Sequence, residues 1–261
     1  MKCKICNAEA KLEFVHKVIQ KYDVEYYYCP NCAFLFTEEP YWLEESYKIP
    51  INLADTGIMS RNLYFSKAIS SIIYLFFEKN DKFLDYAGGY GIFTRLMRDI
   101  GFDFYWDDKY TENILARGFE YDPEKQKGFE LLTTFEVFEH LVNPVEEIRR
   151  MLELSTNIIF STELLPSKVP SPESWWYYGF THGQHISFYS GRTLKYIAEK
   201  YSLNFYSFGE IHLFTKKKIN PILFQFIIRL SKYGLGFLVS QLMKSKTWDD
   251  HLYLEGNPKN G

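Results

Sequence analysis

Residues 82–91 read Lys82-Phe83-Leu84-Asp85-Tyr86-Ala87-Gly88-Gly89-Tyr90-Gly91. The apolar pair near the start predicts a short buried strand. The glycines predict a tight turn into a helix whose buried face carries Phe93, Leu96 and Met97. Because small residues let a ligand approach the backbone closely, this strand, turn and helix are typical of a ligand-binding site.

Strand and helix patterns alternate on both sides of this turn. Further strands are predicted at 102–106, 129–135, 158–162, 203–208 and 211–216, the last two as an antiparallel hairpin at one edge. Helices are predicted at 63–77, after Asn143 with Pro144 in first position, and after Ser190. This alternation predicts an α/β fold with a doubly wound, mainly parallel sheet.

An acidic residue beyond the second of these strands indicates a nucleoside ligand. Asp108 follows Gly91 by 17 residues, where a carboxylate can accept hydrogen bonds from both ribose hydroxyls. Asp107 is the alternative, since a shift of one residue in the strand would exchange the two.

Together these residues resemble the class I, seven-stranded family of S-adenosylmethionine-dependent methyltransferases. The family's first motif, an acid followed by three spaced glycines, is matched by Asp85, Gly89 and Gly91, with Ala87 in place of the first glycine. A nicotinamide-binding fingerprint would have glycine at Thr94 and no acid in the turn. The resemblance implies a Rossmann-like sheet of seven strands and a methyltransferase that uses S-adenosylmethionine.

The resemblance also implies which residues hold the donor. Asp85 suits the cationic amino-acid end of S-adenosylmethionine, directly or through water. The methionine and ribose portions are expected to contact Asp85, Tyr86, Ala87, Gly88, Gly89, Gly91, Asp108 and Phe135. Arg61 is a candidate for the methionine carboxylate, because a guanidinium matches a carboxylate fork. An ordinary exposed arginine at a helix start is the equal alternative.

Residues 133–141 contain a second set of candidate catalytic residues, Glu136, Glu139 and His140. The stretch resembles the E-V-x-E-H sequence that follows the fourth strand in many members of the family. In some branches such a set binds magnesium beside a substrate hydroxyl, and in others it orders the site. Magnesium is the less favoured interpretation here, because a hard cation takes several oxygen ligands and only two carboxylates can be named.

The segment 184–190 provides a candidate general base, His185. It resembles the Y-x-E-H-x-x-Y-F-S stretch of sugar C-methyltransferases that carry an N-terminal four-cysteine module, with Gln184 where glutamate stands. An imidazole titrates near neutral pH, which suits proton removal from an acceptor. The alternative is a hydrogen-bonded supporting histidine, and His182 is the weaker candidate. The neighbouring Trp and Tyr residues at 175–189 are expected to line an acceptor cleft or form a lid.

All four cysteines lie in the first 32 residues, as Cys3-x-x-Cys6 and Cys29-x-x-Cys32. Two such pairs supply four thiolates for one tetrahedral zinc, and a closed site of this kind is structural. Alternating apolar and charged residues between the pairs predict the strands of a zinc ribbon. The chain has no leader pattern, so we expect a cytoplasmic protein with reduced thiols.

The segment from Pro221 to Met243 is apolar but contains Gln225, Arg229, Lys232 and Gln241, so we expect an amphipathic helix and no transmembrane segment. Its apolar face, with Leu223, Ile227, Leu230, Phe237 and Leu242, is expected to pack on the core or act as a lid. A dimer or membrane-surface helix is the alternative, with Lys216–Lys218 as a basic flank. The net charge of −3 argues against nucleic-acid binding.

These patterns predict a zinc ribbon at 1–40, a linker and helix at 41–82, a methyltransferase core at 83–218 and a helical extension at 219–261. We expect methyl transfer to a small molecule, most plausibly a sugar or nucleotide sugar, with His185 as base. The alternatives are a metal-assisted O-methyltransferase that uses Glu136, Glu139 and His140, and a non-catalytic protein that binds partners through its zinc ribbon. The oligomeric state is not predicted.

Overall fold

The computed structural model describes residues 1–48 and 55–256. Residues 49–54, which belong to the predicted linker and include Pro50, and residues 257–261 of the predicted extension lie outside the described residues. The chain divides into two compact units. The first comprises Met1–Leu53, Phe135–Leu152 and Ile159–Lys216, and the second comprises Ala54–Thr134, Glu153–Ile158 and Lys217–Gly261.

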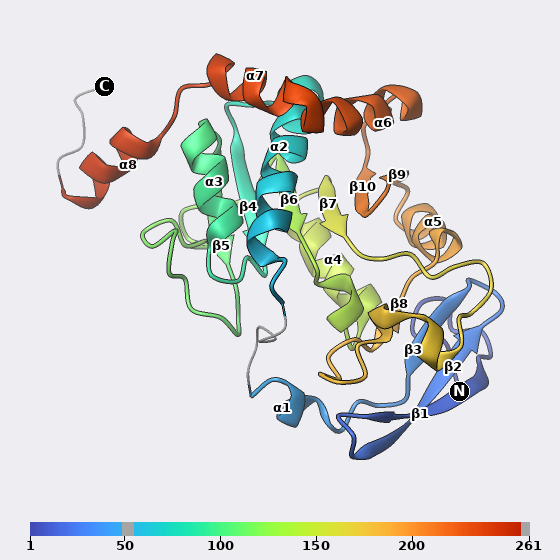
Figure 1. The fold of residues 1–261 in the computed structure, drawn as a ribbon. Coiled ribbons are helices and arrows are strands. Elements are labelled where there is room, and N and C mark those ends of the chain that lie inside the picture. Colours follow the sequence, from blue (N-terminus) through green and yellow to red (C-terminus); the bar gives the residue numbers. More distant parts are fainter. Residues whose placement is uncertain (49–54, 257–261) are drawn as a thin grey trace. The chain divides into compact units, whose positions relative to one another are not determined.

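The second unit contains the glycine-rich turn. β4 (Lys82–Tyr86) lies between β5 (Asp103–Asp107) and β6 (Leu131–Thr134), and all three strands are parallel. Phe83 of β4 pairs with Phe104 on one side and with Leu131 on the other, and all three are fully buried. This burial explains the unbroken apolar pattern of these strands. α3 (Ile92–Ile100) follows the turn and contacts α2 (Ile58–Phe76) (Figure 1).

The first unit contains an antiparallel four-stranded sheet that the sequence predicts only in part. β1 (Lys11–Val18), β2 (Tyr22–Cys29) and β3 (Phe34–Thr37) follow one another, and β8 (Ser187–Phe188) pairs with β3. Leu35 lies opposite Phe188 in this pairing, and both are fully buried. The predicted histidine segment therefore belongs to the same sheet as the predicted ribbon.

The aromatic residues of segment 175–189 mainly form core. Tyr177, Tyr178 and Phe188 are buried in one cluster with Tyr26 and Trp42 from the N-terminal part of the chain. Only Trp176 is largely exposed, at 79%. The expectation that this run lines a cleft is therefore wrong for most of its rings, because they pack against β2 and β3 and exclude water from the first unit.

Two helices begin where the sequence predicts. Ser190 caps α5 with a capping box completed by Thr193, and Pro144 is the first residue of α4. The helices and strands not yet named, up to the C-terminal extension, are α1 (Leu43–Ser46), η1 (Phe138–His140), α4 (Pro144–Leu154), β7 (Ile158–Ser161), η2 (Pro172–Ser174), η3 (Trp176–Tyr178), α5 (Gly191–Lys200), β9 (Asn204–Phe208) and β10 (Ile211–Thr215).

The larger sheet is mixed and has the strand order β5-β4-β6-β7-β10-β9, with β9 and β10 antiparallel. An α/β sheet flanked by helices agrees with the predicted Rossmann-like class, but the predicted seven strands are six among the described residues. Residues 108–130 form no named strand and contribute one isolated bridge, between Glu120 and Trp106. Gly118, Pro123 and Gly128 interrupt any extended run there.

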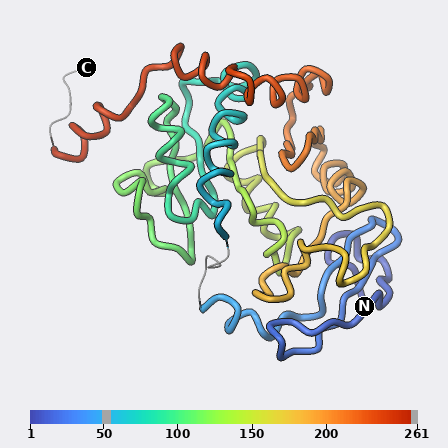
Figure 2. The backbone as a smooth tube through the Cα atoms, viewed as in Figure 1, coloured from blue at the N-terminus to red at the C-terminus, as the bar shows by residue number. Residues whose placement is uncertain are grey.

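The C-terminal extension is not the single helix that its periodicity predicts. It consists of α6 (Pro221–Leu230), the π-type segment η4 (Ser231–Leu235), α7 (Gly236–Leu242) and α8 (Thr247–Leu254), which Figure 2 traces in orange and red. Tyr233 and Gly234 leave the helical conformation, with φ of −107° and 114°, and break the helix there. By length and composition alone, Pro221–Leu242 is apolar enough to cross a membrane, and a third of its most apolar window is buried.

Candidate functional site

The glycine-rich turn is built around the carboxylate of Asp85. The side chain lies at the end of β4 with 2% exposure, and it accepts hydrogen bonds from the hydroxyls of Thr94 (2.9 Å) and Thr133 (3.1 Å). Burial raises the pKa of Asp85 to about 7, although the two hydroxyls lower it in part. A cation bound beside Asp85 would favour its ionised form and lower this pKa.

The turn leaves no room for a side chain at Gly88. A Cβ at Gly88 would lie 2.7 Å from Oδ2 of Asp85 and 2.8 Å from Cδ1 of Trp106. Ala87 adopts the left-handed conformation with φ of 56°, as Gly91 does with φ of 79°. The sequence motif therefore departs from glycine at a position where the backbone favours glycine.

Ala87→Gly is expected to stabilise the protein by about 0.5–1 kcal/mol. A left-handed alanine costs about 1–2 kcal/mol of stability. Glycine relieves this strain, but its greater flexibility in the unfolded chain offsets part of the gain. Urea denaturation of the two proteins measures the difference. Ala68→Gly in the right-handed helix α2 is the matched control and should lower stability, so equal destabilisation by both would contradict the strain.

Asp108 holds the far side of the turn. Its Oδ2 accepts a hydrogen bond from the amide of Gly89 (3.0 Å), and its Oδ1 accepts from the amides of Tyr110 and Thr111. The Trp106 indole donates to the carbonyl of Gly89 (2.9 Å), and the carbonyl of Asp107 accepts from Gly88. Sequence reasoning identified Asp108 but missed Trp106, Thr94 and Thr133, whose side chains fix the turn from neighbouring elements.

Arg61, the candidate for the methionine carboxylate, lies in the first turns of α2. Its guanidinium forms a two-pronged ion pair with Asp55, at 2.9 and 2.7 Å. Arg61 therefore contacts a carboxylate of its own chain with the geometry that a donor carboxylate would require.

In the first unit the structure brings Glu139, His140 and His185 together. One ligand atom from each lies within 4.8 Å of the others. The Nδ1 of His140 donates to the carbonyl of Gln184 (3.0 Å), and the Nδ1 of His185 donates to the carbonyl of Tyr177 (2.6 Å). A carbonyl only accepts, so both protons lie on Nδ1 and both Nε2 atoms keep a lone pair.

The charge states around this group follow from burial. Removal from water lowers the pKa of His140 to about 4 and that of His185 well below its usual value, so both rings are neutral at pH 7. The pKa of Glu139 rises to about 8, first through burial and then through the charge of Glu136. Glu139 is fully buried, and neither of its carboxyl oxygens makes a hydrogen bond of ordinary geometry within the described residues, although the hydroxyls of Tyr177 and Thr162 lie close enough to lower its pKa in part.

Glu136 is held apart from this group. Its amide donates to Oγ of Ser161 (2.8 Å), and that hydroxyl donates back to Oε1 of Glu136 (2.6 Å). Glu136 adopts a left-handed backbone with φ of 55°, which is uncommon for glutamate. No local pattern in the sequence marked Ser161 as the partner of Glu136.

The other predicted residues of this region take supporting positions. His182 accepts a hydrogen bond at Nδ1 from the amide of Gln184 (3.2 Å), and its ring lies 4.7 Å from that of His185. The amide side chain of Gln184 donates to the carbonyl of Ser46 (3.0 Å). Phe135 is half-buried directly after β6.

The four cysteines also form one group. Their sulfurs lie within 4.8 Å of one another, with 3.5 Å between Cys3 and Cys32 and between Cys6 and Cys29. Tetrahedral zinc with Zn–S bonds of about 2.3 Å sets sulfurs about 3.7 Å apart, so the arrangement fits zinc. Asn7 and Ala33, each directly after the second cysteine of a pair, are both left-handed, which makes the two turns alike.

A sequence profile matches the chain from α2 to β9. The profile of the methyltransferase domain family covers residues 60–207, more than half of the chain, from α2 to the end of β9. The chain belongs to this family. The predicted enzyme class, a methyltransferase, is thereby confirmed. The cysteine module of this methyltransferase lies outside the matched residues.

Solved methyltransferase structures resemble this methyltransferase at low sequence identity. The mitomycin 7-O-methyltransferase has a TM-score of 0.44 and 12% identity over 66% of this chain and 59% of its own. A possible histamine N-methyltransferase from Thermotoga maritima has a TM-score of 0.42 and 13% identity over 62% and 92%. A methyltransferase of calicheamicin biosynthesis, solved with S-adenosylhomocysteine, has a TM-score of 0.40 and 11% identity over 61% and 55%.

The methyltransferase therefore spans little more than half the length of two of these three chains. No curated protein matches it.

Proposed function

We propose that this methyltransferase transfers the methyl group of S-adenosylmethionine to a hydroxyl of a small molecule, most plausibly a sugar or nucleotide sugar. The turn Asp85–Gly91 would hold the methionine portion and Asp108 the ribose. Support comes from the family match and from the buried carboxyl of Asp85 in a turn that has no room for a side chain at Gly88. Isothermal calorimetry with S-adenosylmethionine tests this step, and absence of binding would overturn the proposal.

The observation that carries the acceptor half of the proposal is the fully buried carboxyl of Glu139 beside two neutral imidazoles, with one ligand atom of each residue within 4.8 Å of the others. Ionisation of this buried carboxyl is costly, as the raised pKa of Glu139 shows, and a bound cation would remove that cost. Two histidines whose Nδ1–H groups are held by carbonyls are typical metal ligands. Glu139, His140 and His185 would therefore hold a divalent cation, and imidazole ligands favour a transition metal over magnesium.

A cation held there would lower the pKa of an acceptor hydroxyl. The chain's own residues have separate tasks: the carbonyls of Gln184 and Tyr177 orient the two imidazoles, and Ser161 fixes the carboxylate of Glu136 apart from the group. Orientation of the acceptor relative to the donor would provide much of the acceleration.

Glu139→Gln is expected to weaken Mn²⁺ binding at least about tenfold and to lower turnover about 100-fold, because an amide oxygen is a weaker ligand than a carboxylate. Calorimetric titration with Mn²⁺ reports the first effect without an acceptor. Mass gain of one methyl group across a panel of nucleotide sugars reports the second. Glu163→Gln, which changes an exposed neighbouring carboxylate, is the matched control.

The second candidate is metal-free transfer with His185 as general base. Its free Nε2 favours this role, because a neutral imidazole can accept the acceptor's proton. Turnover that resists chelators but falls in His185→Ala would support the base and exclude the metal. Full single-turnover transfer in His185→Ala would exclude both roles.

The four-cysteine group is proposed to hold structural zinc in a reduced compartment such as the cytoplasm. The alternative of a non-catalytic protein, which binds partners through its zinc ribbon, predicts no affinity for S-adenosylmethionine. The calorimetry with S-adenosylmethionine therefore also distinguishes this alternative from the enzyme.

A further inference from the structure

The C-terminal helices of the second unit expose apolar side chains where a surface helix normally has polar ones. Ile222, Phe226 and Tyr233 are 78%, 54% and 85% exposed, and their spacing of four and seven residues puts them on one side of α6 and η4. Beyond the break, Phe237 and Leu242 are exposed as well. Four residues expected to be packed inside, Leu223, Leu230, Phe237 and Leu242, are thus in contact with solvent.

The opposite side of these helices is apolar too, and it is occupied. Phe224, Ile228 and Val239 are buried, and α2 contacts both α6 and α7. Both faces of this segment therefore carry apolar residues, but only one face packs inside the second unit. The exposed face, which we name the 222–242 face after its first and last residues, stays open to water at a free-energy cost that a soluble surface normally avoids.

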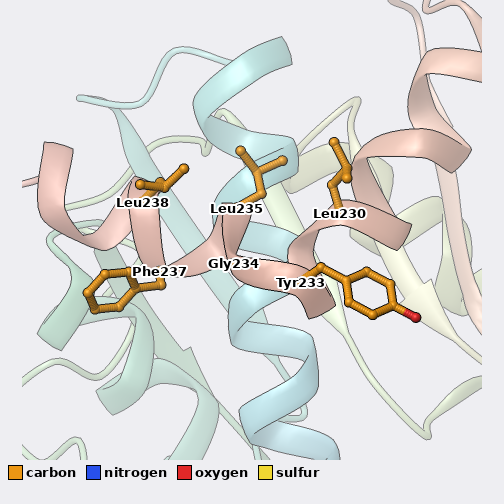
Figure 3. A pocket seen from close by; sticks show the side chains of 6 residues that line it. All are labelled: Leu230, Tyr233, Gly234, Leu235, Phe237 and Leu238. Atoms are coloured by element: carbon orange, nitrogen blue, oxygen red, sulfur yellow. The ribbon is translucent and has the colours of Figure 1, made fainter.

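A shallow hollow in this face is lined almost wholly by apolar atoms. It is formed at the break in the helix by Leu230, Tyr233, Gly234, Leu235, Phe237 and Leu238. Figure 3 shows the three leucines projecting along one edge of the segment, with Tyr233 and Phe237 along the other. The break thus spreads large apolar side chains across a broad strip.

Charge distinguishes this segment from the rest of the chain. Residues 217–246 contain six Lys and Arg and no Asp or Glu, whereas the other 231 residues carry a net charge of −9. Lys218, Arg229, Lys232 and Lys244 are exposed along the segment. Two copies joined face to face through it would bring like charges together, so the charge favours an anionic partner over a second copy of the chain.

We propose that the 222–242 face is a peripheral binding site for an anionic lipid bilayer. The exposed aromatic and aliphatic side chains would enter the boundary between headgroups and acyl chains, and the basic side chains would contact anionic headgroups. The segment lies in the plane of the bilayer and does not cross it, because its other face is packed on α2 and the helix is broken at Tyr233 and Gly234.

Co-sedimentation of the full chain with vesicles tests the proposal. Binding is expected to vesicles of phosphatidylcholine with about 30% phosphatidylglycerol, and at least about tenfold less to phosphatidylcholine alone or at high salt. The double variant Phe226→Gln with Phe237→Gln should lose at least about tenfold in binding, with an unchanged melting temperature because both rings are exposed. Leu12→Gln with Val15→Gln removes two exposed apolar residues of β1 and should bind like the parent chain.

Failure of the parent chain to bind the anionic vesicles would overturn the proposal. So would equal loss in the β1 control, or a dimer in light scattering that Phe226→Gln with Phe237→Gln converts to monomer, since the face would then be an interface between copies. None of these results depends on donor binding or turnover.

Discussion

Removal of metal from the four-cysteine group, or Cys29→Ser, is expected to destabilise the first unit by about 5 kcal/mol or more, which is comparable with the whole stability of a small domain. Cys3, Cys29 and Cys32 are buried, and their two turns are left-handed at Asn7 and Ala33. The two turns contain only one large apolar side chain, Ile5, so a bound metal would provide most of what holds them.

The loss of stability should also affect the histidine segment 184–190, because the cysteine module pairs with it. β3 pairs with β8 at Leu35 and Phe188, and the hydroxyl of Thr193 donates to the carbonyl of Cys32 (2.9 Å). Chelation should therefore lower the melting temperature and also expose the amides around His185 to hydrogen exchange. A ribbon that folded independently would leave the exchange at His185 unchanged.

Metal content separates zinc from a disulfide as the source of this stability. Elemental analysis is expected to find one zinc per chain in the parent protein and in Asn31→Ser, which alters the exposed residue between two ligands. Cys29→Ser should lose the zinc. Equal stability with and without metal, or sensitivity to reducing agents alone, would contradict the zinc assignment.

The local chemistry of turns and caps could be predicted from the sequence. Asp85 to Gly91, Pro144 and Ser190 lie where their patterns place them, because each conformation depends on a few neighbouring residues. The pairing of β3 with β8 and the approach of His185 to Glu139 could not be predicted in this way. They depend on contacts between distant segments, which no periodicity encodes.

The prediction for the C-terminal segment was wrong for a different reason. Periodicity identifies an apolar face, but it predicts burial only when the other face is polar. Here Ile228 and Phe226 are both apolar and lie on different sides, and only the first is buried. The seventh strand was implied by the family resemblance alone, and the glycines and proline of residues 108–130 already disfavour it.

Asp85→Asn is expected to raise the stability of the free protein at pH 8.5 by about 2–4 kcal/mol. Burial raises the pKa of Asp85 from 3.8 to about 7. Below pH 4 the carboxyl is protonated in both folded and unfolded chains and costs nothing. Between pH 4 and 7 the unfolded chain ionises while the folded chain keeps the proton, so stability falls as the pH rises. Above pH 7 the full cost remains, about 1.4 kcal/mol for each pKa unit.

Chemical denaturation across this range checks the sign: the advantage of Asp85→Asn should be absent near pH 4 and largest above pH 7. Asp81→Asn, an exposed carboxylate at the start of the same strand, should show no such trend. An advantage that did not depend on pH would mean that packing, and not ionisation, causes the difference.

The same variant should lose donor affinity at least about tenfold, since an amide does not attract the ammonium group of S-adenosylmethionine. If the donor pairs with ionised Asp85, its binding lowers the pKa of that carboxyl, and protons are released when binding occurs below pH 7. Calorimetry in buffers of different ionisation enthalpy measures this release. We expect a fraction of one proton in the parent chain near pH 6.5 and none in Asp85→Asn. Tight binding without proton release would place the ammonium elsewhere, and the cost of burying Asp85 would then serve the turn alone.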